Sequence, residues 1–464
     1  MSKRLITVLA LAFLLVGVAC AAYAEVQNVK VSGDMTFLGV MRQNFGLEKG
    51  PEGDKVFDKE DFFATQMRLR IDADLTDNVM TTVRLINERG WDSENYNSTG
   101  IALDLASVTL KEFLYGPLSL TIGRQEFAYG NKLVIGSANT YSDSVLNHLP
   151  SDLSMRKAFD GIKAVLNYDP LVIDVIYAYL WRNLDDGYRA YGVKESVHQR
   201  AQLGGINAAY KVDKNTSVEG YLFGVRDLEN DSDARPDTIY TVGGLVKNTS
   251  LKDTTLSFEA AKQFGKSGQF DFNDKAVKRQ GYALQGTIGY AFTQDKVKKY
   301  MPMGSVTWTY LSGDKKVDGK NNAWNSMFYD QALNNITYAI LPFSNLNVVN
   351  VKGSFKPSDD VTLKANLGFY NKASKKATGL GGRSSLDSNK VDSNGDSYEY
   401  PLADGKSYLG TALDLTAVYD YTEDVQIGLT WGMFAPGSAL DKDELSNDKS
   451  AIASQAIASM KVTF

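Results

Sequence analysis

Apolar and polar residues alternate one by one along most of this sequence. In the run from 63 to 74, Phe63, Met67 and Ile71 alternate with Arg68 and Arg70. A repeat of two residues is that of a β-strand with one apolar and one polar face. Eighteen such runs follow one another, so we predict an all-β chain of antiparallel strands. The runs begin near residues 31, 62, 79, 101, 118, 158, 171, 200, 217, 237, 254, 278, 302, 346, 360, 407, 424 and 450.

The connections between these runs alternate between short and long. The connections at 115–117 and 169–170 are short, whereas those at 127–157, 312–345 and 371–406 are long. Short turns at one rim and long loops at the other are typical of an outer-membrane barrel. All 10 prolines lie in connections or at the ends of runs, where no ladder hydrogen bond is lost. We therefore predict a transmembrane antiparallel β-barrel of 18 strands, with short periplasmic turns and long extracellular loops.

A secreted soluble sandwich or propeller would show the same alternation, because its strands are also half-buried. The C-terminus favours the barrel. Phe464 ends the chain after apolar residues at every second position, which resembles the signal that the barrel-assembly machinery reads. Aromatic residues near strand ends would form the two girdles of a membrane protein. We expect this machinery, outer-membrane lipid and lipopolysaccharide as partners.

The N-terminus has the pattern of an export signal. Lys3 and Arg4 precede an apolar stretch, and Ala22-Tyr23-Ala24 fits the small-x-small cleavage rule. We expect residues 1–24 to be a signal peptide and residues 25–464 to form the barrel. A lipoprotein acylated at Cys20 is the alternative, but the usual Leu three residues before that Cys is missing.

The remaining sequence has no second membrane-spanning helix. The best candidate, residues 171–181, is too short and contains Asp174. The mature chain is therefore either soluble or crosses a membrane as a closed barrel, the other structure that satisfies its backbone there.

Metal and cofactor chemistry has little support. Cys20 is the single Cys and His148 and His198 are the only His residues, which excludes a disulfide scaffold and Cys- or His-rich metal sites. We expect no cofactor. The acidic loop 386–399 has the Asp-x-Asn-x-Asp start of a calcium loop but lacks its later Gly and Glu, which leaves weak divalent binding open.

One segment carries a family resemblance. Residues 123–136 read Gly-Arg-Gln-Glu-Phe-Ala-Tyr-Gly-Asn-Lys-Leu-Val-Ile-Gly, and Phe159-Asp160-Gly161 follows about two dozen residues later. Together they resemble the alginate-export family of outer-membrane porins. The resemblance implies an 18-stranded barrel with an arginine-lined pore for a polyuronate.

The alternation also predicts which charged residues line the lumen. Positive and negative side chains are both present, and the electric field between them would favour charged or dipolar solutes over apolar ones. Two details stay open: Arg68 and Arg70 could simply neutralise neighbouring acids, and the phase of residues 118–125 puts Arg124 outward, which is tolerable only near a membrane interface. The phase also slips near 106–107, as at a bulge. The candidate pore-lining residues are Arg68, Arg70, Arg84, Arg124, Lys163, Asp174, Glu219, Glu259 and Asp414.

These patterns predict a passive porin for hydrophilic, charged or sugar-like solutes, not an enzyme. Solutes would diffuse through a charge-lined constriction that the connection 127–157 narrows. The alternatives are a dedicated exporter of an anionic, alginate-like polysaccharide, a sheath around an electron-transfer protein, and an outer-membrane hydrolase. A hydrolase would have to use His148 or His198, and no Gly-x-Ser-x-Gly motif occurs. We expect no nucleic-acid partner.

Overall fold

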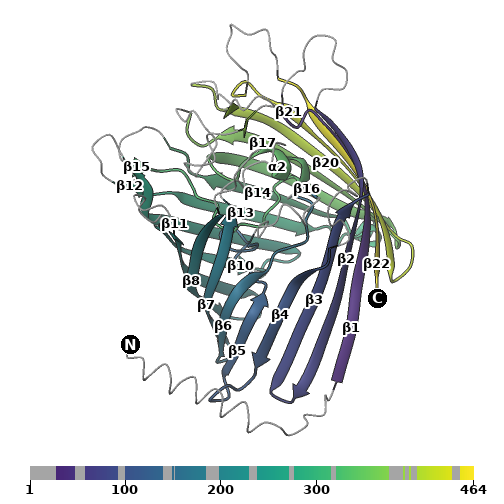
Figure 1. Ribbon diagram of the computed structural model, residues 1–464. Coiled ribbons are helices and arrows are strands. Elements are labelled where there is room, and N and C mark those ends of the chain that lie inside the picture. The colour runs from purple at the N-terminus through teal and green to yellow at the C-terminus, as the bar shows by residue number, and fades with distance from the viewer. Residues whose placement is uncertain are drawn as a thin grey trace.

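The strands close into a single barrel in the computed structural model (Figure 1). Closure comes from the antiparallel pairing of the first strand with the last, in which Asp34 lies opposite Thr463. The structure describes residues 28–47, 58–91, 100–138, 149–150, 152–183, 198–228, 238–270, 276–314, 320–375, 390–391, 397–398, 405–440 and 450–464.

Eighteen strands form the wall, and every run predicted from the sequence begins within four residues of one of them. The wall strands are β1 (Asn28–Gln43), β2 (Lys59–Thr76), β3 (Val79–Gly90), β4 (Ala102–Leu110), β5 (Leu118–Gln125), β6 (Phe159–Asn167), β7 (Leu171–Asn183), β8 (His198–Lys211), β9 (Thr216–Leu228), β10 (Thr238–Asn248), β11 (Thr254–Phe270), β13 (Tyr282–Ala291), β14 (Met303–Leu311), β16 (Leu346–Ser358), β17 (Val361–Lys372), β20 (Tyr408–Asp420), β21 (Val425–Pro436) and β22 (Ala453–Thr463).

Smaller elements lie in the connections. β12 (Ala276–Arg279) pairs with β11 and with β15 (Lys320–Asn321), and β18 (Lys390–Val391) pairs with β19 (Ser397–Tyr398). In the described part of the chain, the short helices are η1 (Lys298–Tyr300) and α2 (Asn335–Ile340). Among the described residues, no helix has the length and apolar character needed to cross a bilayer.

The predicted bulge is present, slightly earlier in the chain. Between β3 and β4, Arg84 lies opposite Leu105 while Leu85 lies opposite Leu103. The register therefore skips Asp104, and the extra residue turns its side chain toward Arg84.

The outer face of the wall is apolar and exposed, as the alternation predicts. Phe63 is 59% exposed, Leu429 55% and Ile288 60%. Each lies on a strand whose alternate residues point to the lumen, so these side chains meet the surroundings of the barrel. An exposed apolar belt of this kind suits lipid.

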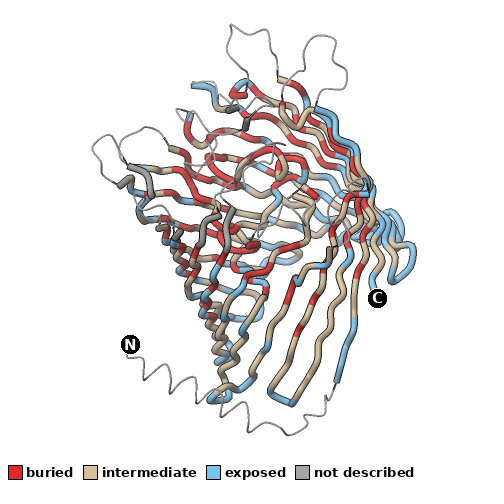
Figure 2. The backbone as a smooth tube through the Cα atoms, in the orientation of Figure 1, coloured by how far each residue is buried: buried red, intermediate tan, exposed pale blue. Residues whose placement is uncertain are grey.

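The inner face differs from the prediction, which made it polar throughout. Along β16, the inward residues Leu346, Val348 and Asn350 are buried, whereas Lys352 and Ser354 are only half-buried. We call the part of the inner face where the inward residues are buried the covered wall. We call the part where they are half-buried or exposed, nearer the short turns, the open wall. Figure 2 shows the same change along β2–β4, from buried residues to half-buried ones toward the short turns.

Two connections that fold back into the barrel explain the covered wall. The first inward segment (residues 126–138 and 152–158) joins β5 to β6, and the second (residues 322–345) joins β14 to β16. Phe127 and Trp324 from these segments share one apolar core with Phe223 and Val348 of the wall. Apolar inward residues are favourable there because protein, not water, lies against them.

Candidate lumenal site

The first inward segment is anchored to two wall carboxylates. The backbone N–H of Gly130 donates to Glu219 Oε1 at 2.8 Å, and that of Asn131 donates to Glu259 Oε2 at 2.8 Å. Gly130 has φ 60°, and a Cβ there would overlap the Glu259 carboxylate. The glycine of the sequence motif is thus required where the chain turns against the wall.

A third carboxylate, Asp174 on β7, holds the same segment and also a basic residue. The hydroxyl of Tyr129 donates to Asp174 Oδ2 at 3.0 Å, and Lys163 Nζ lies 3.1 Å from the same oxygen. The Tyr129 ring also packs against Phe223, with ring centroids 5.3 Å apart. Lys163 and Asp174 both point inward, as predicted, but they neutralise each other.

The fourth predicted acid, Asp414 on β20, anchors the second inward segment. The backbone N–H of Asn335 donates to Asp414 Oδ2 at 2.7 Å, and Asn334 Nδ2 donates to it at 3.0 Å. Asn350 Nδ2 in turn donates to Asn334 Oδ1 at 2.8 Å. Buried carboxylates that accept two hydrogen bonds are far better tolerated than bare ones, so Asp414 stabilises the start of α2.

An ion cluster joins the two inward segments. Lys132 Nζ lies 2.9 Å and Lys157 Nζ 2.6 Å from Asp330 Oδ2. Burial raises the pKa of the Asp330 carboxyl, but the two ammonium groups outweigh it and hold this pKa below its ordinary value. A short parallel bridge between Ile135 and Phe328 adds to the contact. The segments therefore act as one unit inside the barrel.

The three inward-facing arginines that were predicted to line the lumen are all ion-paired. In register, Arg70 lies directly opposite Arg84, an arrangement of like charges that needs compensation. The carboxylate partners supply it, which supports the reading in which these arginines neutralise nearby acids. The pairs are Arg68–Asp34 at 2.9 Å, Arg70–Asp72 at 2.7 Å, Arg84–Asp104 at 2.6 Å and Arg84–Glu126.

Arg124 does not belong to the lumenal set. It shares its face of the sheet with Ile122 and, across the register, Ile162, which are 47% and 43% exposed. Its Nη1 lies 2.7 Å from Asp160 Oδ2 on the same outer face. The strand phase was right about Arg124, and its inclusion among the pore-lining candidates was wrong.

Charged residues of both signs on the open wall were missed: Asp74 and Asp420 point inward without an ion pair to a described side chain, and so do several lysines. Alternation places Lys352, Lys364 and Lys461 inward, on β16, β17 and β22. None of them forms an ion pair with a carboxylate whose position the structure describes. The charge of Asp414 does act on Lys352, from beyond ion-pair distance. The same period-two pattern that placed Arg68 would have found these lysines.

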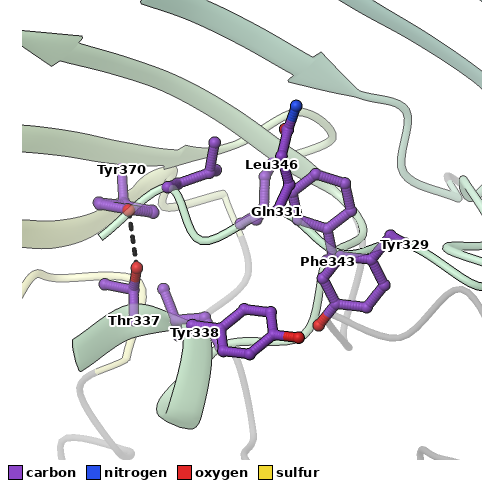
Figure 3. A pocket seen from close by; sticks show the side chains of 9 residues that line it. Tyr329, Gln331, Thr337, Tyr338, Phe343, Leu346 and Tyr370 are labelled. Atoms are coloured by element: carbon purple, nitrogen blue, oxygen red, sulfur yellow. Dashed lines mark hydrogen bonds between the residues drawn. The ribbon is translucent and has the colours of Figure 1, made fainter. Parts of the chain in front are cut away.

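Aromatic residues of the second inward segment enclose a small cavity (Figure 3). Tyr329 and Phe343 stack with centroids 4.4 Å apart, and Tyr338 meets Tyr329 edge-on at 5.8 Å. Thr337 and Tyr370 close one side through a 2.7 Å hydrogen bond between their hydroxyls. The cavity, about 10 Å³, has room for about one water, so these rings stiffen the segment.

Some predictions lie outside the described residues. They are the signal peptide 1–24, His148, the side chain of His198 and the acidic residues of the loop 386–399. Among the residues that the structure does describe, no group of three or more His, Cys, Asp or Glu side chains could hold a metal ion.

Comparisons with known proteins agree with this architecture. The barrel is similar to Pseudomonas aeruginosa OpdQ (TM-score 0.54, 11% identity, 95% of this chain and 98% of that one). It is also similar to P. aeruginosa OccK2 (OpdF), solved with glucuronate (TM-score 0.53, 9% identity, 95% of this chain and 99% of that one). A third similar structure is P. aeruginosa OpdK, solved with vanillate (TM-score 0.51, 11% identity, 94% of this chain and 98% of that one). At these identities the likeness shows the fold alone. A search of curated proteins found no match.

A family model described as "alginate export" matches residues 40–454, nearly the whole barrel. This confirms the resemblance carried by residues 123–136. Family and fold together locate the protein in the bacterial outer membrane. The chain belongs to the alginate export family.

Proposed function

We propose that the barrel is a passive channel for small hydrophilic anions. The observation that carries this proposal is the difference in charge between the two parts of the inner wall. On the covered wall, Asp174, Glu219, Glu259 and Asp414 bind the inward segments. On the open wall, Lys352, Lys364 and Lys461 face the lumen, and none of them forms an ion pair with a described carboxylate.

Unpaired lumenal lysines would raise the local concentration of anions and so favour their passage over that of cations. The inward segments would narrow the path, and the first of them is the connection predicted to do so. Glucuronate and vanillate, found with two structural neighbours, both carry a carboxylate. We therefore propose small carboxylates, including sugar acids, as the solute class.

The alternative is export of an anionic polysaccharide, which the family match favours. A polymer needs a continuous wide path, and it would have to displace segments held by Glu219, Glu259 and Asp414. The two functions differ in pore size. If polymers are excluded from the conducting pore, the small-solute channel is supported. If long polyuronates enter the pore and block its ionic current, export is supported.

A planar-bilayer experiment tests the proposal. Under a KCl gradient, the reversal potential of the purified protein should show anion preference. Replacing Lys352, Lys364 and Lys461 together by Gln should remove most of that preference while leaving conductance of the same order. Replacing Lys262, Lys266 and Lys278 together by Gln removes the same number of charges from the outer face and serves as the control. Cation preference in the unaltered protein would contradict the proposal.

We propose no catalytic role, in keeping with a channel fold. The processing steps are also proposals: removal of residues 1–24 on export, and reading of Phe464 by the assembly machinery. Mass spectrometry of the mature N-terminus tests the first, since it should begin at Glu25. Deletion of Phe464 should lower the yield of assembled barrel and tests the second.

A further inference from the structure

Four basic residues lie together on the outer face of the barrel, near the rim of the long connections. In the register of the sheet, Arg226 of β9 and Lys266 of β11 both lie opposite Thr238 of β10. Lys266 also lies opposite Lys278 of β12. Lys262 lies four residues before Lys266 on β11 and so points to the same face of the sheet. We call Arg226, Lys262, Lys266 and Lys278 the outer basic patch.

The patch points away from the lumen. Leu222, Tyr240 and Phe264 share its face of the sheet and are 47%, 44% and 46% exposed. The alternate residues Val225 and Gln263 are buried on the inner side. All four patch residues are themselves exposed.

The charge of the patch is uncompensated by the part of the protein that the structure describes. None of the four residues forms an ion pair there, and Lys266 directly faces Lys278, an unfavourable pair of like charges. Other cations on the outer face behave differently. Arg124 pairs with Asp160 at 2.7 Å, and Lys59 pairs with Asp61 at 2.8 Å.

The depth of the patch is that of lipid headgroups. Tyr240 and Phe264 stack with centroids 5.5 Å apart, and such rings mark the level where acyl chains meet headgroups. Lys266 is two residues closer to the rim than Phe264, about 7 Å along the strand. The ammonium of Lys262 also reaches toward the rim, where it donates to the carbonyl of Gln280 at 2.5 Å.

We propose that the outer basic patch binds the phosphate groups of a phosphorylated lipid in the outer leaflet. The phosphates would lie between Arg226, Lys266 and Lys278, and the acyl chains would cover Tyr240 and Phe264. Phosphate fits because it offers several acceptor oxygens and a charge opposite to that of the patch. The proposal concerns the outer face and does not depend on which solute the lumen carries.

Lipid binding to the purified full-length mature barrel tests the proposal. The probes are lipopolysaccharide, the same lipid after removal of its phosphates, and inorganic phosphate, each measured by native mass spectrometry and equilibrium binding. The phosphorylated lipid should bind well above the other two. Replacing Arg226, Lys266 and Lys278 together by Gln should weaken its binding about 100-fold, at about 1 kcal/mol for each charge removed.

Two matched variants sharpen the result. Arg124→Gln with Asp160→Asn removes a compensated pair from the same face and should leave lipid binding unchanged. Arg226→Lys, Lys266→Arg and Lys278→Arg keep the charge and should retain binding. Unchanged heat-modifiable mobility on gels and unchanged conductance confirm that each variant folds, and Lys266→Gln with Lys278→Gln replaces the triple variant if it does not.

Three outcomes would overturn the proposal: equal affinity of the triple variant and the unaltered protein, equal binding of the lipid without phosphates, and binding of inorganic phosphate as tight as that of the lipid. The last would assign the patch to a free anion.

Discussion

On the covered wall, Asp174, Glu219, Glu259 and Asp414 each bond to a segment folded into the barrel. On the open wall, Lys352, Lys364 and Lys461 face the lumen and have no ion-pair partner among the residues that the structure describes. The two regions differ because one is packed against protein and the other is not. Carboxylates in the first region hold the structure that narrows the lumen. Lysines in the second remain available to passing solutes. Charge on an inner wall therefore does not by itself identify the residues that select solutes.

The largest effect should come from releasing the first inward segment. Glu219→Ala with Glu259→Ala removes both acceptors of its backbone N–H groups, at a cost of about 1.5–3 kcal/mol each. We expect single-channel recordings to show frequent openings of severalfold larger conductance. Glu219→Gln with Glu259→Gln keeps an acceptor oxygen at each position and should behave much more like the unaltered protein. Identical traces for the Ala and unaltered proteins would show that these carboxylates are not anchors.

Breaking the paired arginines should shift selectivity by a moderate amount. Arg68→Ala with Arg70→Ala leaves Asp34 and Asp72 without their partners, so the lumen gains net negative charge. The reversal potential under a KCl gradient should move toward cation preference. A companion variant that also carries Asp34→Asn and Asp72→Asn should restore the original value. No shift in the first variant would mean that these two arginines lie away from the conducting path.

The ion cluster between the segments should give a smaller effect that depends on pH. The pKa of Asp330 in the cluster lies below its ordinary value. The ion cluster therefore holds the two inward segments together fully at pH values above the ordinary Asp pKa of about 3.9. This contribution is lost as the pH falls through the lowered pKa of Asp330. Openings should therefore stay constant from neutral pH down to about 4 and become more frequent below it.

Asp330→Asn isolates this contribution. It should raise the opening frequency at neutral pH and remove the part of the acid response that Asp330 supplies. An acid response identical in the variant and the unaltered protein would assign that response to other groups.

The smallest effect should come from the outer face. Arg124→Gln leaves Asp160 exposed at the surface of the barrel, outside the lumen. We expect a reversal potential indistinguishable from that of the unaltered protein. A clear change would place Arg124 in the conducting path after all.

The fold was largely predictable from sequence because strand alternation and closure depend on local pattern. Phe63 and Leu429 could be placed outward, and Arg84 and Glu259 inward, by counting residues in twos. The apolar inner residues Val348 and Phe434 could not be understood in this way, since they are covered by segments distant in sequence.

For the candidate site, the sequence predicted which side chains point inward but not which residues they bind. Alternation placed Asp174 inward but could not reveal that Tyr129 and Lys163 would meet it. The anchor at Gly130 depends on a φ that only its contact with the wall explains. The lysines of the open wall were readable from the sequence, but nothing in a single strand distinguishes them from residues that acquire a partner.

Reagent access to the two parts of the inner wall tests the central claim most directly. Val348 and Ser354 both point inward from β16, the first on the covered wall and the second on the open wall. We expect a membrane-impermeant thiol reagent to modify Ser354→Cys rapidly and Val348→Cys at least about 100-fold more slowly, since local opening must precede reaction at a buried site. Equal rates of modification would contradict the account.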